Sequence, residues 1–173
     1  VIHPHHRGSF VTTGESQESV IRFSEHAINL AERRAVEAAP HEIGGILIGW
    51  WEASLRIAVV HDLIVVPDRQ PGVNNYTRRQ APAQQALSDH LHAEADPRLG
   101  YVGEGHSHPE PQGPSPQDRT ELAALVRQTH HAVAMVVLAC TPAQDVTLHA
   151  LVGRPRWPRR VALDHATTER GTA

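Results

Sequence analysis

The chain has little of several residue types that define common protein classes. Its 173 residues include one cysteine and one methionine, and all sixteen basic residues are arginine. The single Cys140 excludes an intramolecular disulfide framework and a multi-cysteine zinc cluster. No apolar run approaches the ~18 residues that a membrane span needs. Compositional bias explains the missing lysine; the alternative is that a protein acting on lysine-linked conjugates avoids its own modification.

The remaining composition is that of one folded domain. Hydrophobic residues make up 40% and charged residues 20% of the chain, which excludes a disordered, charge-dominated protein. Folding a chain of this length buries roughly 70% of its surface, which is enough for one hydrophobic core. The net charge of −3 gives no general attraction to nucleic acid. No N-terminal stretch has the pattern of a signal peptide, and we expect a cytoplasmic protein.

Hydrophobic periodicity and capping residues predict strands interleaved with helices. We expect a flexible N-terminal arm over 1–18, a single domain over 19–165 and a C-terminal tail over 166–173. Helices are predicted at 25–38 with Ser24 as N-cap, around 84–95, and after Ser115. The predicted strands are 20–23, 42–51, 55–67, 99–108, 131–140, 146–153 and 156–164. The pattern favours an α/β fold with a mixed, largely antiparallel sheet flanked by helices.

Fourteen histidines are present, but only those at ligand spacing indicate chemistry. His106 and His108 are two residues apart on a predicted strand, so both imidazoles lie on one face and can clamp a metal ion. A short linker returns the next helix to this strand end, where the carboxylate of Asp118 can reach the same ion. Two imidazoles, one carboxylate and an open fourth position are the ligand set of a hydrolytic zinc site.

The residues around this set also have structural interpretations. Ser115 and Asp118 have the spacing of a helix N-cap and its third helical residue, and both could serve only as a cap. Glu42 is the best candidate for the proton acceptor, because it begins an apolar strand whose next residues include two glycines. The alternative for Glu42 is a solvated charge at a strand end.

Three segments together resemble the signature of the JAMM/MPN+ metalloproteases, especially the bacterial JAB-domain branch. They are EIGGILIG over 42–49, HSHP over 106–109 and SPQD over 115–118. The resemblance covers about 20–165 and implies an MPN/JAB-like fold. The linker between the second histidine and the serine has six residues, where the family usually has seven.

The resemblance implies a zinc peptidase, similar to a deubiquitinase, with a role for each matched residue. His106, His108 and Asp118 would bind Zn²⁺, and Glu42 would act as general base on the attacking water. Ser115 would donate a hydrogen bond to the developing oxyanion. The rival hypotheses are a non-catalytic MPN scaffold module in a multiprotein complex, and an iron oxygenase with two histidines and a carboxylate.

The family acts on the bond after the C-terminal tail of a protein modifier. The implied partners are a ubiquitin-like or sulfur-carrier protein with a Gly-Gly-type tail, together with activating or conjugating enzymes of the same system. We expect Tyr76, Arg78 and Arg79 in the loop 68–80 to form a wall of the substrate groove, and an ordinary polar loop is the alternative.

A small basic and aromatic patch is predicted near the C-terminus. Arg154, Arg156, Arg159 and Arg160 surround Trp157 in the sequence. A solvated terminal strand or a docking surface for an acidic partner is favoured here over nucleic-acid binding.

Overall fold

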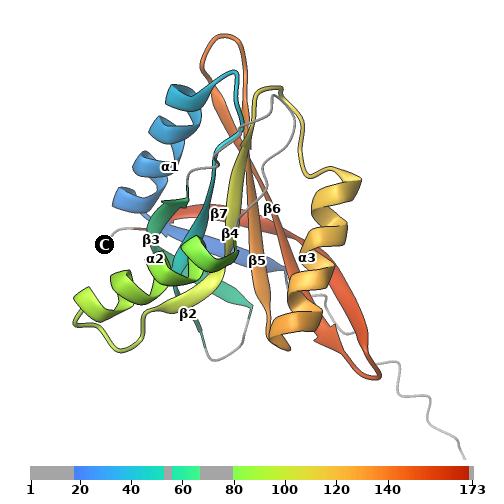
Figure 1. Cartoon of the computed structure of the whole chain (residues 1–173). Helices are drawn as coiled ribbons and strands as arrows, with labels where there is room; N and C mark the ends of the chain where they lie inside the picture. The colour runs from blue at the N-terminus through green and yellow to red at the C-terminus, as the bar shows by residue number, and fades with distance from the viewer. Residues whose placement is uncertain (1–17, 53–55, 67–79, 172–173) are drawn as a thin grey trace, which may run out of the picture.

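The computed structural model in Figure 1 describes residues 18–52, 56–66 and 80–171, without the side chains of residues 80 and 81. The described residues form seven strands and three helices. In chain order they are β1 (Ser19–Ser24), α1 (Glu25–Ala38), β2 (Gly44–Trp51), β3 (Ile57–Val66), α2 (Gln80–Ala93), β4 (Gly100–His108), α3 (Pro116–Thr129), β5 (Val133–Cys140), β6 (Val146–Arg156) and β7 (Arg160–Gly171). No helix in these ranges is long and apolar enough to cross a membrane.

The predicted fold, a mixed and largely antiparallel sheet flanked by helices, is wrong, because the strands close into a barrel. Their order is β1-β3-β2-β4-β5-β6-β7, and β7 pairs again with β1. The pairs β1–β3, β1–β7 and β4–β5 are parallel, and the other four neighbouring pairs are antiparallel. Closure leaves each strand paired on both sides, which removes the exposed edges of an open sheet.

The closing strand β7 is the element that the sequence pattern describes least well. Residues 166–171, expected as a tail, lie in β7 and pair in parallel with β1, from Ser19↔Ala166 to Ser24↔Gly171. The exposed positions of this strand carry polar residues, and its sequence contains few large apolar residues. Pairing between the two ends of the domain therefore decides closure, and local periodicity cannot predict it.

Alternating residues of the strands build two apolar layers. All eight residues of β5 are buried. Ala134, Val136 and Leu138 contact a cluster that includes Ile28 of α1, whereas Met135 belongs to a second cluster beneath α3. Leu47 belongs to the same cluster as Ile28, whereas its neighbour Ile46 belongs to a third cluster, beneath α2. Helix α1 thus covers one face of the strands, and α2 and α3 cover the other (Figure 1).

The predicted starts of helices α1 and α3 are confirmed. Ser24 caps α1, since its Oγ accepts a hydrogen bond from the Ala27 amide at 3.1 Å. Helix α1 spans the predicted residues, and Ile28, Ala31 and Ala35 form its buried stripe. Helix α3 begins after Ser115 as expected and ends near the start of β5, so its first turn lies at the carboxyl end of β4.

Gly103 of β4 lies between two neighbouring strands, opposite Leu47 of β2 and Ala134 of β5. A Cβ at this position would lie 2.0 Å from the carbonyl oxygen of Ala134 on β5. A backbone atom cannot yield as a flexible side chain can, so β4 and β5 approach closely only because residue 103 has no side chain. Gly100, at the start of the same strand, would have nothing within 4 Å of an added Cβ.

We expect Gly103→Ala to lower the free energy of unfolding by about 1–3 kcal/mol, because the added methyl group forces the two strands apart. Gly100→Ala is the matched control in the same strand, and its effect should lie within about 0.5 kcal/mol. Urea unfolding of both variants measures the difference. Equal stability of the two variants would contradict the close approach of β4 and β5.

Candidate metal centre

The two histidines at the end of β4 face each other, as the strand periodicity predicts. Their ring centroids are 4.9 Å apart, and the two Nε2 atoms are separated by 3.1 Å. The Nδ1 atom of His108 lies 3.1 Å from the backbone carbonyl oxygen of Gln112. A carbonyl oxygen only accepts hydrogen bonds, so Nδ1 carries the proton and Nε2 of neutral His108 presents its lone pair to the cluster.

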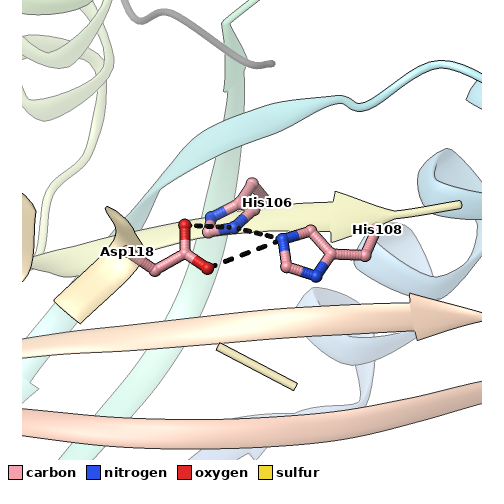
Figure 2. Close-up of side chains that lie close together, drawn as sticks. All are labelled: His106, His108 and Asp118. Carbon is pink, nitrogen blue, oxygen red and sulfur yellow. Dashed lines mark hydrogen bonds and ion pairs between the residues drawn. The ribbon is translucent and has the colours of Figure 1, made fainter. Parts of the chain in front are cut away.

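Asp118 completes the cluster from the first turn of α3 (Figure 2). Its Oδ1 atom lies 3.2 Å from His106 Nε2, and its Oδ2 atom lies 3.6 Å from His108 Nε2. The predicted cap is also present, because Ser115 N donates to Asp118 Oδ2 at 2.6 Å and Asp118 N donates to Ser115 Oγ at 3.2 Å. The capping box aims the carboxylate at the imidazoles, so capping and ligation are compatible roles.

The surroundings of Asp118 keep its carboxylate ionised. Burial raises its pKa, but the hydrogen bond and charge of His106, with the hydrogen bonds from Ser115, outweigh burial. The pKa of Asp118 therefore lies well below its usual value. An ionised carboxylate is the form that binds a cation.

The distances and donor chemistry of this cluster fit a small divalent cation. Ligand atoms from His106, His108 and Asp118 all lie within 4.8 Å of one another. Tetrahedral zinc bonds of about 2.0–2.2 Å would separate ligand atoms by about 3.4 Å. The two Nε2 atoms are 3.1 Å apart and His106 Nε2 lies 3.2 Å from Asp118 Oδ1, which is close to this value. Three protein ligands also leave one tetrahedral position for water or substrate. The residues could therefore hold zinc, with the imidazole and carboxylate donors that this ion prefers.

Glu42 lies beside this cluster because its chain segment is tied to β4. Its neighbour Ile43 accepts a hydrogen bond from Ser107 N at 2.8 Å and donates its own amide hydrogen to Ser107 Oγ at 3.0 Å. Ser107 lies between the two histidines in sequence and is 2% exposed. The strand register continues with Gly44 opposite His106. These contacts hold the residue before Ile43 at the same end of the barrel as the histidines.

One cleft of about 270 Å³ joins the cluster, Glu42 and Ser115. Five carboxylates line it, those of Glu42, Glu104, Glu110, Asp118 and Glu121, and no arginine is among the described residues that do. Glu104 accepts a hydrogen bond from the Tyr101 hydroxyl at 3.0 Å. The excess of negative charge favours a cation in the cleft.

The structure thus brings together all five residues that the sequence assigns to catalysis or metal binding. The other three predicted residues, Tyr76, Arg78 and Arg79, lie outside the described residues. The six-residue linker after His108, one residue shorter than the family pattern, still delivers Asp118 to the histidines.

Sequence reasoning missed five residues of the site: Ser107, Gln112, Glu104, Glu110 and Glu121. Periodicity could have indicated two of them. Glu104 lies two residues before His106 on the same strand, and Glu121 lies one helical turn after Asp118. The contacts of Ser107 and Gln112 with Ile43 and His108 depend on tertiary structure and have no local signal.

The fold and the cleft together define a class, a mixed β-barrel that could hold a divalent cation between two imidazoles and a carboxylate. Comparison with known proteins is consistent with this class. Residues 24–151 match a profile described as "Prokaryotic homologs of the JAB domain", and the chain belongs to this family. The resemblance to the JAB-domain branch of the JAMM/MPN proteins is therefore confirmed.

Two individual proteins illustrate the relationship. A protein of Enterobacter hormaechei subsp. hoffmannii, named CD-NTase/cGAS isopeptidase, is 30% identical over 137 residues, which cover 76% of this chain and 74% of the relative. The solution structure of protein DSY2949 from Desulfitobacterium hafniense has a TM-score of 0.64 at 16% identity. That alignment covers 88% of this chain and 94% of the other, and it supports the fold alone.

We expect the purified protein to bind one zinc ion per chain, and His108→Ala or Asp118→Asn to weaken binding more than about 100-fold, because each change removes a ligand. His131→Ala is the matched control, since this histidine is exposed and lies outside the cleft. Zinc content after dialysis and calorimetric titration measure the effect. Full zinc occupancy in His108→Ala would refute its role as a ligand.

Proposed function

We propose that this protein is a zinc-dependent isopeptidase or peptidase of the JAB family. It hydrolyses the bond after the C-terminal tail of a ubiquitin-like modifier or sulfur-carrier protein. The observation that carries the proposal is the cluster of His106, His108 and Asp118 in one cleft with Glu42 and Ser115. A scaffold module needs no such set of donors, whereas metal-assisted hydrolysis uses metal ligands, a proton acceptor and a donor for the oxyanion.

The relatives narrow the substrates to be tested first. One relative is named for an isopeptidase activity toward CD-NTase/cGAS. Isopeptide-linked conjugates of that class of enzyme are therefore the first candidates, and activating or conjugating enzymes of the same system are the expected partners. Sulfur-carrier proteins are the alternative source of the same type of tail.

The residues of the cleft account for the proton movements of amide hydrolysis. Zinc, when bound, would lower the pKa of a water ligand to about 7 and polarise the scissile carbonyl. Glu42 accepts a proton from the attacking water while the oxygen of this water bonds to the carbonyl carbon. Glu42 then gives this proton to the leaving nitrogen, and the C–N bond breaks to give a carboxylic acid and an amine, between which the remaining proton moves to leave a carboxylate and an ammonium group.

Ser115 can act on the oxygen that develops negative charge. Its Oγ already accepts a hydrogen bond from the Asp118 amide, and this bond uses an oxygen lone pair. The hydroxyl hydrogen, which also helps to lower the pKa of the Asp118 carboxyl, is not held by that bond and can turn to the oxyanion, because Ser115 lines the same cleft. Donation to the oxyanion stabilises the tetrahedral intermediate, while the cap continues to hold Asp118 in place.

We expect Glu42→Gln to reduce cleavage on the order of 10²–10⁴-fold while zinc is retained, because glutamine cannot accept the proton of water. The substrate is a linear or isopeptide-linked conjugate with a Gly-Gly tail, and release of the modifier is followed by electrophoresis. Glu110→Gln, an exposed carboxylate of the same cleft, is the matched control and should keep nearly full activity.

The same experiment separates the rival hypotheses. An inactive native protein that binds zinc normally would favour the scaffold module over the enzyme. Iron as the resident metal, with oxygen-dependent turnover, would replace the hydrolase by an oxygenase.

Ser115 requires a pair of substitutions, because removal of its side chain affects both the helix cap and the proposed oxyanion contact. We expect Ser115→Gly to slow cleavage about 10²–10³-fold, since no hydroxyl remains. Stability should fall by only about a few tenths of a kcal/mol, because glycine is tolerated as an N-cap. Ser115→Thr retains the hydroxyl and should restore most of the rate. If Ser115→Gly cleaves as fast as the native protein, Ser115 is only a cap.

A further inference from the structure

The hairpin that joins β6 to β7 carries the most exposed large apolar residue of the described chain. Trp157 is 93% exposed. It lies at the turn between Arg156 and Arg160, which face each other in the last register pair of the two strands. Residues 155–160 are all exposed and include no acidic residue. We call Arg156, Trp157, Arg159 and Arg160 the hairpin tip.

The charge of the hairpin tip is uncompensated within the described residues. The neighbouring Arg154 is buried and pairs with Asp164 at 3.1 Å. Arg156, Arg159 and Arg160, by contrast, have no carboxylate within ion-pair distance in the parts of the chain that the structure describes. Burial lowers the pKa of Arg154, and repulsion from Arg56 and Arg156 adds to this effect. Like charges thus accumulate at this end of the barrel.

The hairpin tip lies far from the candidate metal centre. His106 is opposite Val137 on β5, and Val137 is opposite His149 on β6. Arg156 follows His149 by seven residues, which corresponds to about 23 Å along the strand. In Figure 1 the β6–β7 turn projects at the end of the barrel away from the β4–α3 connection. A molecule bound to the tip would leave the cleft open.

We propose that the hairpin tip is a docking site for a partner protein, whose contact segment combines carboxylates with apolar side chains. Tryptophan and arginine are the residues that most often dominate the binding energy of protein interfaces. The tip offers one exposed aromatic side chain flanked in the sequence by three exposed arginines. Carboxylates of the partner would neutralise the guanidinium groups, and apolar side chains of the partner would remove Trp157 from water.

The charge pattern favours a protein over nucleic acid as the occupant. Nucleic-acid binders neutralise roughly six to ten phosphates along a basic surface. Here three arginines form a compact patch on a chain whose net charge is −3 and whose candidate catalytic cleft is acidic. A long polyanion would gain few contacts beyond the tip. The inference depends on the hairpin alone and does not require the proposed activity.

Fluorescence anisotropy with a defined probe tests the proposal on the full chain. The probe is a short fluorescein-labelled peptide of alternating glutamate and leucine, and its glutamine–leucine counterpart has the same length without the charge. We expect the acidic peptide to bind at least about tenfold more tightly than the neutral one, with an affinity that weakens as salt is raised. Trp157→Ala and Arg156→Glu should each weaken binding about tenfold or more.

Arg127→Glu is the matched control, because it makes the same charge change at an exposed arginine of α3 and should leave binding unchanged. Circular dichroism confirms that each variant is folded. Equal binding of the acidic and neutral peptides, or no effect of Trp157→Ala, overturns the proposal.

Three further outcomes would assign the tip to a different occupant and also overturn the proposal. They are tighter binding of an oligothymidylate of equal charge, tighter binding of phosphatidylserine vesicles, and self-association that Trp157→Ala abolishes. Zinc content and cleavage by Trp157→Ala should equal those of the native protein. This result separates failure of the docking site from failure of the proposed activity.

Discussion

Two imidazole nitrogens and a carboxylate are held within 4.8 Å of one another in an acidic cleft, and the candidate function depends on this convergence. None of the three side chains is placed by its own segment alone. Strand β4 puts both histidines on one face, the Gln112 carbonyl orients His108, and the capping box of α3 turns Asp118 toward them. Because contacts outside the cluster hold these donors in place, the site is preorganised to bind a cation.

The barrel places the other groups of the cleft by backbone hydrogen bonds. Ser107 is buried between the two histidines and bonds to Ile43 through both its amide and its hydroxyl. One small residue therefore links the segment of Glu42 to the strand that carries the metal ligands. Close approach of β4 and β5 at Gly103 sets the position of the same strand from its other side.

Charge is divided between the two ends of the molecule. Five carboxylates line the cleft of the candidate metal centre. Trp157 and the three exposed arginines beside it in the sequence begin about seven residues further along β6 than the level of the cleft. The separation allows one end to attract a cation while the other presents cations and an aromatic ring. The small net charge of the chain conceals this polarity.

The sequence by itself determined most of the elements and the three candidate metal ligands. Ser24 and Ser115 predict two helix starts through capping, apolar runs predict the strands, and the spacing of His106 and His108 places both rings on one face. These are local rules, whose range is a few residues. Only the tertiary structure decided that β7 closes the barrel against β1, and that Ser107 and Gln112 support the site. Such contacts join residues distant in the chain or depend on loop geometry, so hydrophobic periodicity carries no record of them.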